Sequence, residues 1–136
     1  MSPPVLDARL HLTVQPGLFF VSQLQEIPVS IIDLLQSNNN RFLSLTRTSE
    51  EISIVGEWYH DIPPAFESDA CWKCIKVNGP MDFALVGVVS ELTAPLKKAL
   101  ISVFIASTWN TDYLLVKEKD LEYAVQALKD DGWTFL

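Results

Sequence analysis

The side chains best suited to chemistry lie in a short polar corner between two apolar runs. Thr108, Trp109, Asn110 and Asp112 stand in this corner. Asp112 could neutralise an α-ammonium or a cationic side chain, while Thr108 and Asn110 could orient that group through neutral hydrogen bonds. An acid at a turn also commonly accepts hydrogen bonds from backbone N–H groups. A ligand-binding role and a turn-forming role therefore both remain open for Asp112.

Trp109 lies at the tip of this corner, where a large aromatic ring is costly to leave in water. It therefore predicts a contact with a ligand, with a charged group through a cation–π interaction, or with a second subunit. The subunit contact is the simplest of the three interpretations.

A second candidate binding element is Gly87 with Val88 and Val89, which begin a predicted helix. The free N–H groups of a first helical turn and the positive end of the helix dipole suit a carboxylate, and glycine permits close backbone approach. The α-carboxylate of an amino acid fits this description. The alternative is that Gly87 only makes a tight turn from a loop into the helix.

Catalytic and metal sites find little support. Cys71 and Cys74 form a lone Cys-x-x-Cys, but residues three apart on a strand point to opposite faces of the sheet. A zinc site would need two further ligands, which only His11 and His60 could offer. No serine or cysteine lies in a recognisable nucleophile elbow. We therefore expect no enzyme activity, no metal and no cofactor.

The polar corner must be held by the elements around it. Residues 103–106 and 113–116 predict two strands of a hairpin, because they are rich in β-branched and aromatic residues. Helical spacing of apolar residues predicts helices over 88–99, with Pro95 as an irregularity, and over 118–129, which Gly132 is placed to stop. With strands at 72–77 and 133–136, the second half is predicted to be β-α-β-β-α-β.

The first half repeats much of this pattern. Strands are predicted over 8–14, 18–24, 42–45 and 52–58, and a short helix over 29–36. Shifted by 61 positions, Thr46 falls on Ser107 and Glu51 on Asp112, so a hydroxyl and a carboxylate recur at the two ends of a corner. An internal duplication is one interpretation and shared hairpin chemistry is the other. A duplicated site at Thr46 and Glu51 would be degenerate.

These elements predict an α+β fold of two ferredoxin-like modules, each an antiparallel sheet with helices on one face. The first module is incomplete, because a Pro-rich linker stands where its second helix would be. The predicted boundaries are 1–62 for the N-terminal module, 63–70 for the linker and 71–136 for the C-terminal module.

Composition narrows the classes of partner. The chain has 136 residues, 49% of them hydrophobic, and a net charge of -7, of which about -5 lies in residues 1–68. No basic face is available for a phosphate backbone, so nucleic-acid binding is disfavoured. Met1-Ser2-Pro3-Pro4 lacks the features of a signal peptide, and no apolar run reaches the length of a membrane span. We expect a cytoplasmic protein without membrane attachment.

Four segments together resemble the small tandem ACT-domain proteins related to aspartate kinase regulatory domains. They are residues 42–55, 72–83, 87–89 and 107–116. The same segments are similar to the cytosolic arginine sensors of the animal TOR pathway. The resemblance covers roughly residues 10–136.

The resemblance implies a non-catalytic regulatory module that binds an amino acid at an interface between ACT domains. By matching motif, its ligand would lie between the loop Leu85–Val89 and the corner Thr108–Asp112. The arginine-sensing loop has an acidic residue where this chain has Leu85, so a small neutral or apolar amino acid is as plausible as arginine. The expected partners are this ligand, a second copy of the chain and a protein target. The alternative is an oligomerisation or docking protein without any ligand.

Overall fold

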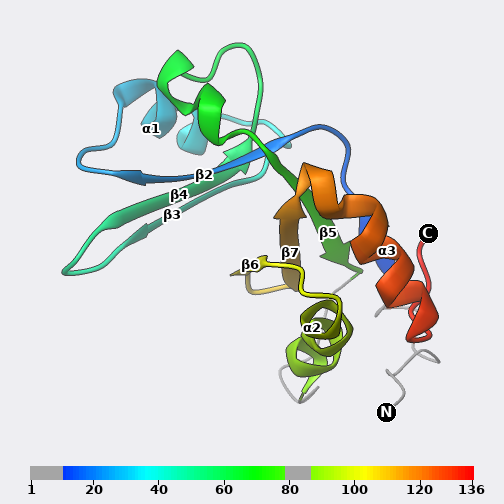
Figure 1. Cartoon of the computed structure of the whole chain (residues 1–136). Coiled ribbons are helices and arrows are strands. Elements are labelled where there is room, and N and C mark those ends of the chain that lie inside the picture. Colours follow the sequence, from blue (N-terminus) through cyan, green and yellow to red (C-terminus); the bar gives the residue numbers. More distant parts are fainter. Residues whose placement is uncertain (1–10, 79–86) are drawn as a thin grey trace. The chain divides into compact units, whose positions relative to one another are not determined.

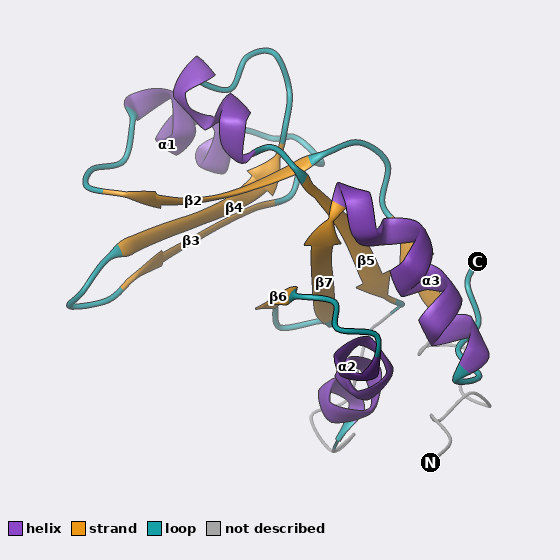
Figure 2. Cartoon of the chain, viewed as in Figure 1, coloured by secondary structure: helices purple, strands orange, loops and turns teal. Residues whose placement is uncertain are grey.

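The computed structural model describes residues 11–78 and 87–136, which are arranged in two compact units (Figure 1). One unit is Gly17–Trp72, and the other combines the N-terminal segment up to Pro16 with Lys73–Leu136. Each contains antiparallel strands and helices (Figure 2). The predicted α+β class is therefore confirmed.

The Gly17–Trp72 unit is built on three antiparallel strands in the order β3-β4-β2. These are β2 (Phe19–Leu24), β3 (Leu43–Arg47) and β4 (Ile52–Glu57). Helix α1 (Val29–Gln36) connects β2 to β3, and only Ile31 of this helix is fully buried. Of the other apolar residues of this helix, Ile32 and Leu35 remain exposed, with 38% and 53% of their surfaces accessible.

The Pro-rich segment is part of this unit rather than a bare linker. Residues Pro64–Asp69 form the 3₁₀-helix η2, which starts at a proline because proline has no N–H to leave unpaired. Phe66 of η2 is buried and stacks on Phe20 of β2 with ring centroids 5.2 Å apart. The core of the unit consists of Phe20, Ile31, Ile54, Ile62 and Phe66. A short 3₁₀-helix thus packs on the core of this unit, where the sequence predicted a linker in place of a second helix.

The other unit has strands in the order β1-β5-β7-β6. They are β1 (Leu12–Val14), β5 (Trp72–Val77), β6 (Val103–Ser107) and β7 (Asp112–Lys117). Strand β1 pairs antiparallel with β5, whereas β2 pairs with β4, so the two N-terminal strands do not form a hairpin with each other. The part of the predicted strand 8–14 before residue 11 lies outside the described residues.

Two helices cover one face of this sheet. They are α2 (Val88–Lys98), which is continuous through Pro95, and α3 (Leu121–Asp130), which follows the 3₁₀-helix η3 (Glu118–Asp120). Alternate residues of β5 and β7 meet both helices in one core. That core consists of Leu12, Ile75, Val77, Val88, Leu92, Leu96, Leu114, Val116, Ala124, Leu128 and Trp133.

The predicted C-terminal strand at 133–136 is wrong as an independent element. Only a single parallel bridge forms there, between Leu12 and Phe135. The Leu12 N–H donates to the Thr134 carbonyl and the Leu136 N–H to the Leu12 carbonyl, both at 2.8 Å. The segment is short, and its Trp133 is buried in the core, so it borders β1 instead of entering the sheet as a full strand.

The compact units differ from the predicted modules at the N-terminus. The prediction placed residues 1–62 together and 71–136 apart, with 63–70 between them. In the structure, β1 belongs with the C-terminal elements, and Leu12 is completely buried in their core. Sequence order suggested the boundary, but hydrogen bonding to β5 decides where β1 belongs.

Candidate functional site

The polar corner is the tip of the β6–β7 hairpin. Ser107 and Asp112 are the last residues paired between the two strands. Beyond them, the Thr108 N–H donates to the Thr111 carbonyl at 2.9 Å, which closes the turn. The predicted hairpin is therefore confirmed. Its backbone holds Asp112 at the start of β7 rather than on the turn itself.

Asp112 is largely buried, with 8% of its surface exposed. The Ser107 hydroxyl donates to Asp112 Oδ1 at 2.6 Å, so the carboxylate is held in one orientation. Among the described residues, 11–78 and 87–136, no other side chain or backbone group donates a hydrogen bond to this carboxylate. An oriented, partly desolvated carboxylate is suited to accept a charge-assisted hydrogen bond from an ammonium or guanidinium group.

Thr111 fastens the corner to the rest of the unit, a role that the sequence analysis missed. It is 2% exposed, and its hydroxyl donates to the Val77 carbonyl at 2.6 Å. Val77 is the last residue of β5, the strand that leads toward Gly87 and α2. The only sequence signal was a threonine among other turn residues, which does not distinguish a buried anchor from an exposed side chain.

Gly87 precedes α2 as predicted. Its φ of +84° lies in the left-handed region, and its carbonyl accepts the Glu91 N–H at 2.9 Å to begin the helix. A Cβ at this position would meet nothing within 4 Å, so glycine is needed for its conformation rather than for space. Val88 is buried in the core and Val89 is half-buried. Leu85 and Val86 lie outside the described residues.

The remaining predicted site residues are exposed. Thr108 and Asn110 face solvent, and Trp109 has 80% of its surface accessible. The structure thus brings Ser107, Thr111 and Asp112 together where β7 begins, and the Thr108 hydroxyl donates to the Thr111 carbonyl at 3.2 Å. Trp109 and Asn110 remain at the exposed tip of the corner. An exposed tryptophan at a hairpin tip offers a contact surface to a partner.

The β3–β4 hairpin repeats the β6–β7 hairpin, but the predicted shift of 61 is wrong by one residue. Strand pairing aligns Arg47 and Ile52 with Ser107 and Asp112, a shift of 60. Thr48 closes its turn by donating its N–H to the Glu51 carbonyl at 2.9 Å. The repeat therefore preserves the turn but not the hydroxyl–carboxylate pair.

A cavity of about 490 Å³ lies at this first corner. Its lining includes Glu51 but not Thr46, so the two residues predicted as a degenerate site do not meet there. The lining residues are Gln23, Leu24, Gln25, Arg47, Thr48, Ser49, Glu50, Glu51 and Ile52. Gln23 donates to Glu51 at 3.2 Å, which gives the carboxylate a partner within the unit.

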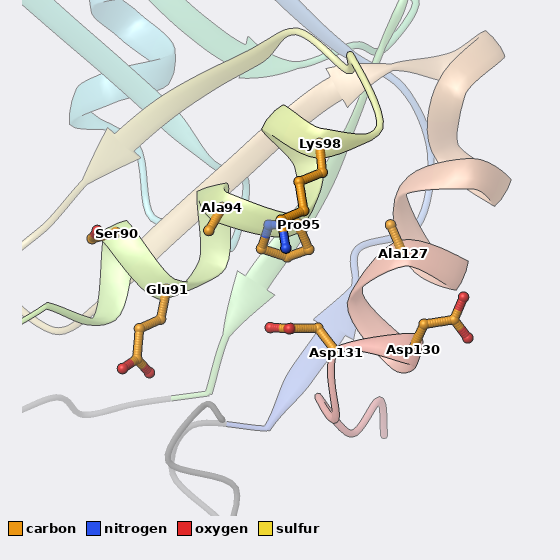
Figure 3. Close-up of a pocket in the computed structure, with 8 residues that line it drawn as sticks. All are labelled: Ser90, Glu91, Ala94, Pro95, Lys98, Ala127, Asp130 and Asp131. Atoms are coloured by element: carbon orange, nitrogen blue, oxygen red, sulfur yellow. The ribbon is translucent and has the colours of Figure 1, made fainter. Parts of the chain in front are cut away.

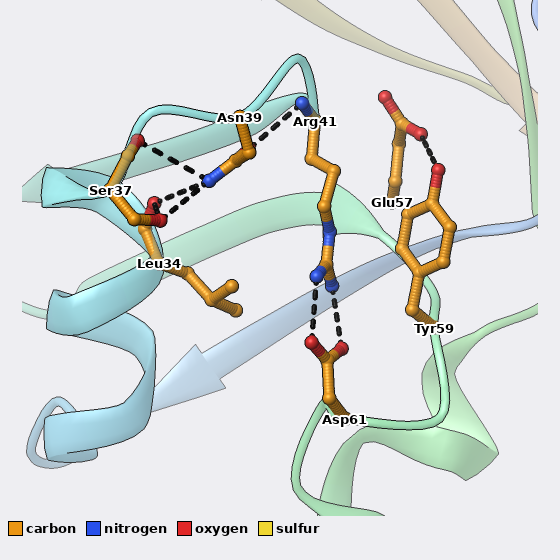
Figure 4. Close-up of polar contacts among 7 residues, drawn as sticks. All are labelled: Leu34, Ser37, Asn39, Arg41, Glu57, Tyr59 and Asp61. Carbon is orange, nitrogen blue, oxygen red and sulfur yellow. Dashed lines mark hydrogen bonds and ion pairs between the residues drawn. The ribbon is translucent and has the colours of Figure 1, made fainter.

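A charged cluster lies next to β3 and β4, and its side chains contact one another (Figure 4). Arg41 makes a two-pronged ion pair with Asp61, both bonds 2.8 Å long, and its guanidinium lies 4.1 Å from the Tyr59 ring centroid. The hydrogen bonds from Arg41 hold the pKa of Asp61 below its ordinary value of 3.8. The hydrogen bond from Tyr59 to Glu57 raises the pKa of the phenol.

Metal ligation finds no support in the described part of the chain. Among residues 11–78 and 87–136, no three His, Cys, Asp or Glu side chains are grouped to hold an ion. Cys71 and Cys74 form no disulfide, and Cys74 is buried in a strand. Nor does any helix in these two ranges combine the length and apolarity required to span a bilayer.

Comparison with known proteins gives consistent relatives. Residues 67–130 match the family model of the ACT domain. The cytosolic arginine sensor for mTORC1 subunit 1 of Bos taurus is 27% identical over 136 residues, a match that covers 91% of this chain. The chain spans 40% of the length of that relative.

Solved structures share the fold over nearly the whole chain. A protein from Agrobacterium tumefaciens is 32% identical with a TM-score of 0.77, covering 94% of this chain and 92% of its own. Aspartate kinase from Synechocystis superimposes with a TM-score of 0.67 at 15% identity, over 95% of this chain and 28% of the kinase. At that identity the kinase establishes a shared fold only.

Proposed function

Because the chain belongs to the ACT-domain family, we propose that it is a non-catalytic regulatory protein that senses an amino acid. The similarity to a protein described as an arginine sensor supports this role. The wider comparison with aspartate kinase supports the fold on which such a role is built. The family relation favours amino-acid binding over catalysis, in keeping with the absence of a nucleophile motif in the sequence.

The observation that carries the proposal is the oriented carboxylate of Asp112. Its Oδ1 accepts the Ser107 hydroxyl at 2.6 Å, and Thr111 ties the same corner to the end of β5. We assign Asp112 to the ligand's α-ammonium group and the N–H groups that follow Gly87 to its α-carboxylate. Thr108, Trp109 and Asn110 would complete the site.

The ligand is proposed to bind where two ACT modules meet, which would place a second subunit beside the exposed Trp109. A homodimer would then provide the interface. Ligand bound across it would favour the assembly state for which it has the higher affinity. Arginine and small neutral or apolar amino acids are both candidate ligands, because Leu85 replaces the acidic residue of the arginine-sensing loop.

A thermal-shift screen of the twenty amino acids tests the proposal. A ligand at 100 times its dissociation constant stabilises the folded protein by about 2.7 kcal/mol, which raises the melting temperature of a chain this size by roughly 9 °C. One or a few amino acids should give this response. The absence of a response to all twenty would contradict amino-acid sensing.

Two variants test the site itself. Asp112→Asn removes the charge from the carboxylate, and Gly87→Ala strains the start of α2, so both should lose most of the thermal response to the active amino acid. Glu50→Gln is the matched control, because Glu50 stands at the equivalent corner of the β3–β4 hairpin and is exposed. If Asp112→Asn bound as tightly as the unmodified protein, the site assignment would be wrong.

A second candidate function is oligomerisation or partner docking without a ligand. Trp109 supports it, because 80% of this large side chain is exposed at a hairpin tip. The docking function predicts no amino-acid response, together with self-association or partner binding that Trp109→Ala weakens. Sedimentation of the unmodified protein and of Trp109→Ala, each with and without amino acids, distinguishes docking from amino-acid sensing.

A further inference from the structure

Helices α2 and α3 end in the same backbone arrangement but with different residues. After α3, the Gly132 N–H donates to the Lys129 carbonyl at 2.9 Å and the Trp133 N–H to the Leu128 carbonyl at 3.0 Å. After α2, Leu100 and Ile101 make the corresponding bonds to Lys97 and Leu96, both at 3.0 Å. Both ends are therefore Schellman motifs.

In this motif the residue after the helix C-cap, here Leu100 or Gly132, must adopt a left-handed conformation. Gly132 does so with a φ of +99°, at no steric cost, whereas Leu100 has a φ of +60°. A leucine is strained there because its Cβ approaches the following carbonyl oxygen. The same chain thus uses glycine at one helix end and a disfavoured leucine at the other.

Packing within the chain does not compensate for this strain. The Leu100 side chain is 92% exposed, so almost none of its apolar surface is removed from water. Several other large apolar side chains are also exposed. Within the two described ranges, 11–78 and 87–136, Leu100 is the only non-glycine residue with a positive φ. Leu100 therefore weakens the isolated fold through its backbone, and its exposed side chain contributes almost no burial to offset that strain.

The exposed Leu100 side chain lines a cavity beside α3. A cavity of about 370 Å³ lies between the end of α2 and α3, with Leu100 and the 71% exposed Tyr123 among its walls. Its other lining residues are Ala99, Ile101, Asp120, Gln126, Ala127 and Asp130. A second cavity of about 340 Å³ shares the lining residues Ala127 and Asp130 with the first and lies between the two helices (Figure 3). We call the two cavities together the α2–α3 groove.

The charges on the groove are mostly acidic. Asp120 and Asp130 are the charged residues of the first cavity, and Glu91, Asp130 and Asp131 line the second together with Lys98. The Lys119 ammonium lies 3.9 Å from the Asp120 carboxylate, at the edge of this surface. Asp131 already accepts a hydrogen bond from the Trp133 indole at 3.3 Å, and Asp130 one from Gln126 at 2.8 Å. Such a surface complements an apolar side chain flanked by cations.

We propose that the α2–α3 groove docks a segment of a partner protein in which an apolar residue is flanked by lysine or arginine. Leu100 and Tyr123 contact the apolar residue, and the acidic rim attracts the cations. A second copy of the chain is the weaker occupant of this groove, because it would bring a net charge of -7 to an acidic rim. This interaction is independent of amino-acid binding at the corner.

The test begins with a displayed library of random peptides of about 16 residues, selected on the folded protein. Enriched peptides should carry an apolar residue among basic residues. Their affinity should fall at least roughly tenfold for Leu100→Gly, because the leucine contact is lost. The same variant should melt about 2–4 °C higher, because glycine relieves the left-handed strain. Loss of binding together with a gain of stability cannot arise from misfolding.

Leu136→Ala is the matched control, because Leu136 is also an exposed leucine of this unit, at 71%. It should leave peptide affinity unchanged, and Asp120→Asn with Asp130→Asn should lower affinity and weaken its salt dependence. Enrichment of acidic peptides, or equal binding to Leu100→Gly, would overturn the proposal. So would sedimentation of the unmodified protein as a dimer that Leu100→Gly dissociates, because the occupant would then be a second copy.

Discussion

At the scale of single residues, the β6–β7 corner owes its position to two short hydrogen bonds, one buried and one partly buried. Ser107 orients the Asp112 carboxylate, while Thr111 joins the corner to the last residue of β5. These contacts cross up to 34 positions of sequence. The binding role proposed for Asp112 therefore depends on Thr111, which holds the corner in place.

Thr111→Val tests that dependence. Valine keeps the shape of threonine but leaves the Val77 carbonyl without its donor, so the free energy of unfolding should fall by about 1–2 kcal/mol. Chemical denaturation measures the change. Thr111→Ser, which keeps the hydroxyl, should recover much of the loss, and Thr134→Val, at an exposed position, should cost less than about 0.5 kcal/mol. A Thr111→Val protein as stable as the original would show that the bond does not anchor the corner.

The Arg41–Asp61 pair should make a small, pH-dependent contribution to stability. Because the folded-state pKa of Asp61 lies below its ordinary 3.8, the stabilisation is present above pH 3.8 and is lost as pH falls through the folded value. The Asp61 side chain is 60% exposed, so the contribution should stay below about 1 kcal/mol.

Denaturation of the unmodified protein and of Asp61→Asn across the acid range measures this contribution. The stability difference between the two proteins should be constant near neutral pH and vanish at low pH. A difference that persisted undiminished below the folded pKa would mean that the ion pair is not its source.

Sequence reasoning found the candidate residues better than it found their environments. Gly87 and Asp112 were predicted from residue type, since a glycine before a helix and an acid at a hairpin corner are local signals. Thr111 was missed because its partner, the Val77 carbonyl, is brought near only by the fold. Leu100 was missed because strain appears only in the backbone dihedral angle.

At the scale of elements, the two hairpins share a turn but differ in how their strands are packed. The shift of 60 places Gly56 of β4 opposite Leu43, in the position that Val116 occupies in β7. A Cβ on Gly56 would lie 2.9 Å from Phe20 Cζ and 3.2 Å from Leu43 Cδ1. Glycine here makes room for the ring of its cross-strand neighbour, Phe20.

Gly56→Ala should therefore destabilise the Gly17–Trp72 unit by about 1–3 kcal/mol through overpacking. Phe20 cannot move aside easily, because it is fully buried between Trp58 and Phe66. Adding Phe20→Leu should cost less in the Gly56→Ala background than alone, and a double-mutant cycle by denaturation measures this coupling. Additive losses would show that the two side chains do not compete for space.

The sequence predicted most elements but not all of their pairings. Periodicity predicted the hairpin strands and all three α-helices, because amphipathic patterns are local. The predicted strand at 133–136 was wrong because a strand forms only by pairing with a neighbour. Here that neighbour is β1, and the two segments share a single bridge, between Leu12 and Phe135. The 3₁₀-helix at Pro64–Asp69 was hidden by its prolines, which indicated a linker.

At the scale of the whole molecule, the N-terminal strand β1 belongs to the same compact unit as the C-terminal elements. Leu12 pairs with Val77 across β1 and β5, and its backbone bonds the segment after α3. Its side chain is fully buried in the core that contains Trp133. A boundary drawn in sequence order divides this core, so the predicted module 71–136 lacks one of its strands.

Leu12→Ala tests this division of the molecule. Removing a fully buried leucine should cost about 2–5 kcal/mol, and the loss should fall on the unit whose core contains it. Native-state hydrogen exchange should accelerate in β5, β7 and α3 more than in β3 and β4, because compact units open separately. Ile54→Ala, which removes a fully buried residue from the other core, should give the opposite pattern. If Leu12→Ala accelerated exchange only in β3 and β4, β1 would belong to the N-terminal unit.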